Sequence, residues 1–165
     1  MFTDFWIRHL VEKVGIPQEM CAVLALWLVM TWVFKKEKEF NQVITNMQET
    51  SATHSIKGIL GPYMQDIFPV PDSIIDTINK SRREHLTFLF SHLEAQIAIL
   101  QSSYHNDIVC TNKQLYCDAT ILGTLMQTAL ESKLWPIPMS PYDGLSVNKL
   151  SSALRQLRVA SYCDY

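Results

Sequence analysis

The sequence predicts a mainly α fold with a small β portion, that is, an α+β chain, and three of its features lead there. Met20–Phe34 has no charged residue and is rich in β-branched and aromatic side chains, which favours a buried strand. Glu84–Tyr104 carries apolar residues at helical spacing with neither glycine nor proline. Between these stretches, the glycines and prolines of residues 56–71 exclude a long regular element.

The N-terminal elements follow from local patterns. Apolar residues at helical spacing predict a first helix over Thr3–Val14, and Gly15 ends it. Ala22–Met30 is then predicted as a strand covered on both faces, with Trp32–Lys36 continuing it or pairing back on it as a second strand. A short amphipathic helix is expected over Phe40–Met47.

The C-terminal half is predicted to be a small helical bundle. Asp72 can cap a short helix, which a basic break separates from the long helix Glu84–Tyr104. A second long helix over Asn112–Glu131 should lie antiparallel to it, because the connection between them is short. After three prolines, Ser146 or Asn148 can cap a last helix. The predicted division is therefore residues 1–50, a connector at 51–71, and a bundle at 72–160.

Composition and charge restrict the class of protein. With 48% hydrophobic and 18% charged residues the chain can bury a core, which excludes disorder. A net charge of -2 gives no footprint for nucleic acid, so neither DNA nor RNA is an expected partner. Four cysteines without a CxxC pair, and an N-terminus without a signal peptide, predict a reduced cytoplasmic chain.

Residues that could carry chemistry are few. His85 and His92 share one face of the long predicted helix, but no third metal ligand is specified, so hydrogen-bonded surface histidines are the simpler interpretation. Cys110 with His105 has no orienting acid, which makes a structural thiol the better interpretation. We expect no catalytic residue, metal or cofactor, and therefore no enzyme.

The basic break Lys80, Arg82 and Arg83 is the candidate contact with an anionic surface. These side chains could meet anionic lipid or an acidic partner. The alternative is a solvated group of charges at the start of a helix.

Five short stretches stand out by their order and spacing: Gly15-Ile16-Pro17, Val23–Val29, Ile67-Phe68-Pro69, Leu89–Leu100 with Tyr104, and Ala119–Leu125. Together, over about residues 3–130, they resemble FERM domains. The first part resembles the end of the ubiquitin-like lobe of that family, and the later part resembles its acyl-CoA-binding-protein-like helical lobe. The resemblance implies a partial ubiquitin-like lobe followed by a helical lobe. The family's first hairpin and its third lobe have no counterpart here, so the family's GTPase contacts are not expected.

The resemblance implies a non-enzymatic adaptor or scaffold that makes protein contacts at the cytoplasmic side of a membrane, at the periphery or at cell junctions. The partner is unidentified. The alternative is a small single-pass membrane protein anchored by residues 20–34, with a cytosolic helical bundle. Self-association is also expected, through an open edge of the strand Ala22–Met30.

Overall fold

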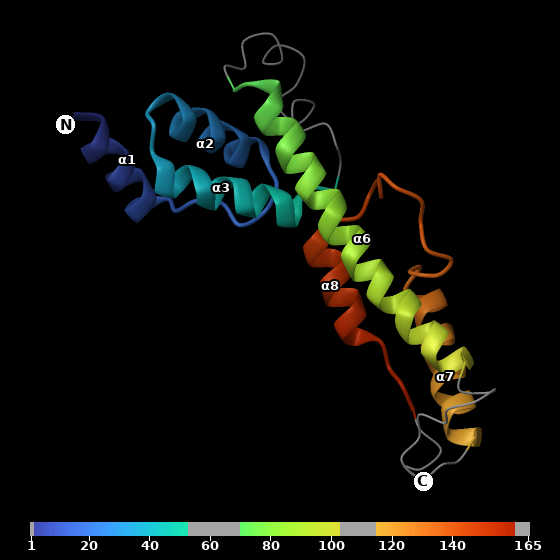
Figure 1. The fold of residues 1–165 in the computed structure, drawn as a ribbon. Helices are drawn as coiled ribbons and strands as arrows, with labels where there is room; N and C mark the ends of the chain where they lie inside the picture. Colours follow the sequence, from blue (N-terminus) through green and yellow to red (C-terminus); the bar gives the residue numbers. More distant parts are fainter. Residues whose placement is uncertain (1, 53–69, 103–114, 161–165) are drawn as a thin grey trace. The chain divides into compact units, whose positions relative to one another are not determined.

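The computed structural model describes residues 2–52, 70–102 and 115–160, and every regular element among these residues is a helix (Figure 1). The helices are α1 (Phe2–Lys13), α2 (Ala22–Val33), α3 (Glu37–Thr50), α6 (Asp72–Ser102), α7 (Leu115–Glu131) and α8 (Val147–Gln156). The predicted helix Thr3–Val14 is confirmed as α1, and the helix predicted after Gly144 is confirmed as α8. Phe40–Met47 lies in α3, which is longer at both ends than predicted. The predicted helix Asn112–Glu131 is confirmed as α7 from Leu115 on, and its first three residues lie outside the described ranges.

The predicted α+β class is wrong, and with it the ubiquitin-like lobe. Ala22–Met30 lies in α2, a helix, and Trp32–Lys36 is the end of that helix and the turn after it. A short apolar run has the same pattern in a buried strand and in a helix that is apolar all round, so periodicity could not separate them. Because a helix pairs its backbone groups internally, the open strand edge expected to drive self-association does not exist.

The chain divides into two compact units, which we describe separately. Unit 1 comprises Met1–Glu84 and Pro141–Asn148, and unit 2 comprises His85–Ser140 and Lys149–Tyr165. Both units draw on α6, whose first turns belong to unit 1 and whose remainder belongs to unit 2. The predicted boundary at residues 51–71 stays a prediction, because most of that connector lies outside the described residues.

The core of unit 1 is built around α2 and α3, which lie side by side in opposite directions (Figure 1). Asn46 on α3 donates a hydrogen bond from Nδ2 to the Pro17 carbonyl at 2.9 Å, which fastens the loop before α2 to α3. The buried apolar side chains of this core come from α1, α2, α3 and the start of α6, and they include Ile7, Leu24, Trp27, Leu28, Val43, Met47, Ile75 and Ile78.

Helix α6 is one continuous element of 31 residues. The expected short helix at Asp72 followed by a basic break is therefore wrong: Lys80, Arg82 and Arg83 lie within the helix. No glycine or proline occurs between Asp72 and Ser102, so nothing in this segment interrupts the backbone hydrogen bonds.

In unit 2, α7 runs opposite to the second half of α6 (Figure 1), as the short connection predicts. Of five residues expected to be buried together, Leu93, Ile97 and Leu125 are buried, whereas Leu89 and Leu122 are half-buried. The segment after α8 is tied to α7 through the Ala160 amide, which donates to Thr124 Oγ1 at 3.1 Å.

Candidate interaction surface

Arg82, one of the three predicted contacts with an anionic surface, is buried in unit 1. Its side chain is 1% exposed. The guanidinium donates to four backbone carbonyls: from Nε to Ser51 at 2.7 Å, from Nη1 to Pro141 at 3.1 Å, and from Nη2 to Tyr142 at 2.7 Å and Leu145 at 2.6 Å. We call this arrangement the Arg82 clamp. The prediction that Arg82 meets an external anion is therefore wrong.

The electrostatics of the clamp fit an internal role. Burial lowers the pKa of Arg82, because desolvation disfavours its charged form, while the carboxylate of Asp143 acts in the opposite direction. Arginine is basic enough to remain protonated despite such a shift. The amide of Gly144 adds a fifth link, donating to the Ala52 carbonyl at 2.8 Å. The clamp therefore joins the end of α3 to the loop at residues 141–145.

Lys80 and Arg83 are exposed on the same helix. Lys80 Nζ lies 3.9 Å from Glu84 Oε1, and both side chains are mostly in solvent. Such a pair contributes at most about 0.5 kcal/mol. Two members of the predicted basic cluster, Lys80 and Arg83, are therefore exposed to solvent.

A surface that the sequence reasoning missed lies on α2. Its inner face is buried, with Leu24 and Leu28 fully inaccessible and Thr31 donating from Oγ1 to the Trp27 carbonyl at 2.8 Å. The opposite face is also apolar. We define this outer face as Val23, Leu26 and Val33, which are 48%, 40% and 52% exposed, together with Met30 at its edge, which is half-buried and also packs against the core of unit 1.

The end of α2 explains why the chain can turn sharply after such an apolar helix. The amide of Lys36 bonds to the Thr31 carbonyl at 2.9 Å and that of Lys35 to the Trp32 carbonyl at 3.2 Å, which is a Schellman motif. Lys35 has φ 52°, the left-handed conformation that glycine usually occupies in this motif. The turn places Lys35 and Lys36 directly beyond the outer face.

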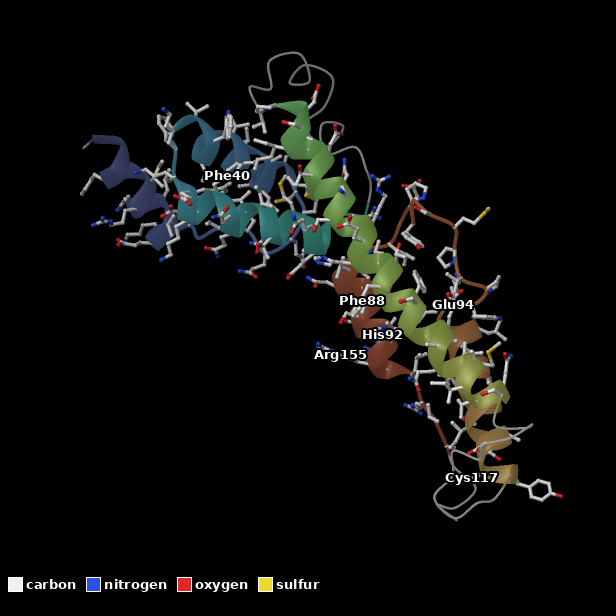
Figure 2. The ribbon with its side chains drawn as sticks, viewed as in Figure 1. Phe40, Phe88, His92, Glu94, Cys117 and Arg155 are labelled. Carbon is white, nitrogen blue, oxygen red and sulfur yellow. The ribbon has the colours of Figure 1, made fainter. Side chains whose placement is uncertain are left out.

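A hollow of about 470 Å³ lies at this corner between α2 and α3. Trp32, Val33 and Phe40 form its apolar wall, and Lys35 and Lys36, together with Glu37, form its polar part. The rings of Trp32 and Phe40 lie 5.7 Å apart at 42°, and Figure 2 labels Phe40 on α3. Because Val33 belongs to both features, the hollow extends the outer face at its C-terminal end.

The residues considered for catalysis or metal binding do not form a site in the described part of the chain. His92 on α6 packs against the ring of Phe88 with centroids 4.4 Å apart (Figure 2), and His85 is exposed. Among the described residues no group of three or more histidine, cysteine or acidic side chains is arranged to hold a metal ion. His105 and Cys110 lie outside those residues.

One signal in the sequence could have revealed the outer face. The segment Ala22–Val33 has no charged residue at any position, so whichever face is turned from the core must be apolar.

Comparison of the chain with protein-family models, with curated proteins and with solved structures found no match. In the described ranges, no helix combines the length and the apolar character that crossing a bilayer requires.

Proposed function

We propose that the chain is a non-enzymatic adaptor module, and that it binds protein partners through the outer face of α2. The observation that carries this proposal is the exposure of Val23, Leu26 and Val33 on a helix whose other face is buried. Contiguous exposed apolar patches are characteristic of interaction sites. The cytoplasmic side of a membrane remains the proposed location.

Energetics favour a partner for this face. Burying a large aliphatic side chain contributes about 1.5–3 kcal/mol, so covering three that are about half exposed contributes roughly 1 kcal/mol each. The inner face of α2 already holds the helix against α3, so binding at the outer face orders little additional backbone. A preformed surface loses less conformational entropy on association than a flexible one.

The spacing of the outer face suits a helical partner. Its residues follow one another at intervals of three, four and three, the arrangement with which two helices pack side by side. The likeness of Leu89–Leu100 to the helical lobe of FERM domains also favours the adaptor class. The ubiquitin-like lobe that accompanied that likeness plays no part in the proposal.

Site-specific photocrosslinking of the full chain in cells tests this function. A benzophenone amino acid replaces Leu26 on the outer face, and the matched control replaces Asn41, an exposed polar residue of α3. We expect polypeptide adducts at position 26 and none of those species at position 41. The proposal fails if position 26 gives only lipid adducts and the chain resists carbonate extraction, the result expected of a protein anchored by residues 20–34.

A further inference from the structure

We propose that the partner of the outer face of α2 is the outer face of α2 in a second copy of this chain, with the two helices antiparallel. This inference rests on the proposed function, because it assumes that the outer face makes protein contacts. It specifies the occupant and the register, neither of which the proposed function requires.

The register follows from the positions of the four outer-face residues. In heptad terms Val23 and Met30 occupy one type of seam position, and Leu26 and Val33 occupy the other. The set is symmetric about its midpoint. An antiparallel pair centred there places Val23 opposite Val33 of the second copy, and Leu26 opposite Met30 of the second copy. The pairing then covers the three exposed side chains of each copy and the part of Met30 that the core leaves accessible.

A second copy meets this face without burying a charge. Helix α2 contains no ionisable side chain. Its hydroxyl side chain, Thr31, lies on the inner face and donates its hydrogen bond to the Trp27 carbonyl within the helix. Two copies therefore remove only apolar surface from water, and the desolvation penalty that accompanies buried ions does not arise.

The two ends of α2 carry complementary charge. Glu19 is exposed just before the helix, whereas Lys35, Lys36 and Lys38 follow it. An antiparallel arrangement brings the N-terminal end of each helix beside the C-terminal end of the other. That arrangement brings Glu19 near the lysines of the second copy, and it also places the helix dipoles in their favourable opposite orientation.

The same charges argue against a lipid surface as the occupant. Lys35, Lys36 and Lys38 alternate with Glu37 and Glu39, so the corner has one net positive charge, and the whole chain has a net charge of -2. Surface binding to anionic lipid depends on an excess of basic residues. A second copy of α2 suits this corner better, because it brings the carboxylate of its Glu19 near the lysines.

The pairing should be weak and reversible. Helix α2 has 12 residues and is about 18 Å long, so two copies bury less than the roughly 1,200 Å² of a standard stable interface. The association should therefore depend on concentration over the micromolar range.

Sedimentation velocity of the full chain, from about 5 μM to about 500 μM, tests the pairing in the range of a weak interface. Two variants each place one charge at an exposed position of α2. Val23→Glu puts a negative charge near the N-terminus of the helix and Val33→Lys a positive charge at its C-terminus, which the helix dipole favours, so both should fold. We expect the wild type to shift from monomer to dimer and each variant alone to remain monomeric. A one-to-one mixture of the two variants should dimerise again, because the introduced charges face each other.

Two controls make the test specific. Thr45→Lys, on the exposed side of α3, should dimerise like the wild type. A mixture of Val23→Glu with Val23→Lys should remain monomeric, because position 23 faces its own counterpart only in a parallel pair. Recovery in that mixture, or association of the single variants, overturns the proposal.

A monomeric wild type over the whole range also overturns the proposal. The proposed function then stands if position 26 still crosslinks to a different polypeptide. Both fail together only if position 26 yields no adduct with another polypeptide, for example when it crosslinks solely within its own chain.

Discussion

Two regions of unit 1 reverse the usual distribution of side chains in opposite ways. At the Arg82 clamp a charged side chain is inside, and on the outer face of α2 apolar side chains are outside. The clamp is closed, since its four hydrogen bonds are to carbonyls of the same chain. The outer face is open, since covering it requires something beyond the described residues of unit 1. Residue type alone therefore identifies neither a binding site nor a core.

Removing the clamp should have the largest effect. Arg82→Met keeps the apolar stem but leaves four carbonyls without their donor, and we expect the free energy of unfolding to fall by about 3–5 kcal/mol. Urea denaturation measures the change. Arg83→Met is the matched control on the exposed side of α6 and should change stability by less than about 0.5 kcal/mol. Equal effects of the two substitutions would contradict the clamp.

The two faces of α2 should respond differently to truncation. Leu28→Ala on the inner face should cost about 2–5 kcal/mol, because it leaves a cavity in the core. Leu26→Ala on the outer face should cost less than about 1 kcal/mol when the chain is studied at low concentration as a monomer. Thermal and urea unfolding of both variants decide the matter. A similar cost at both positions would show that the outer face is covered within the chain.

Lys35→Gly should stabilise the chain slightly. Lys35 has a left-handed backbone, φ 52°, at a position where a β-carbon is unfavourable. Glycine relieves that strain, and after its larger unfolded-state entropy is subtracted we expect a gain of about 0.5–1 kcal/mol. Lys133→Gly is the parallel test in unit 2, because Lys133 has φ 56° after α7. A loss of stability in both variants would contradict the left-handed backbone conformation of Lys35 and Lys133.

The clamp should add no pH dependence near neutrality. Folding lowers the pKa of Arg82, chiefly through desolvation, so the charged form binds its proton less tightly in the folded chain than in the unfolded one. The free energy of unfolding would therefore rise with pH only where the pH passes through the folded-state pKa. That occurs in strongly alkaline solution. The stability difference between wild type and Arg82→Met should therefore be the same at about pH 6 and about pH 9. A difference that changes across this interval would indicate another titrating partner.

What could be predicted from the sequence was limited by the range of the interactions. Helices with one apolar face, such as α1 and α3, follow from residues three and four apart. Helix α2 does not, because both of its faces are apolar and the helical period disappears. The expected strand was wrong for this reason.

The misassignment of Arg82 has a different cause. Arginine is usually exposed, and a helix carrying Lys80, Arg82 and Arg83 gives no local sign that one of the three is inside. The carbonyls that hold Arg82 lie 31 to 63 residues away along the chain. No pattern within one element could have indicated them. The outer face of α2, by contrast, was readable in principle from the missing charges.

The clamp also constrains the order of events during synthesis. Three of its carbonyl acceptors, Pro141, Tyr142 and Leu145, follow the central segment of unit 2 in the chain. While a nascent chain is still shorter than this, α2 and α3 can already have formed, but the guanidinium of Arg82 has only Ser51 to bind. Unit 1 therefore cannot reach its final stability before the ribosome has released residue 145. Until then α1, α2 and α3, which leave the ribosome before residues 141–145, lack the three hydrogen bonds that those residues contribute.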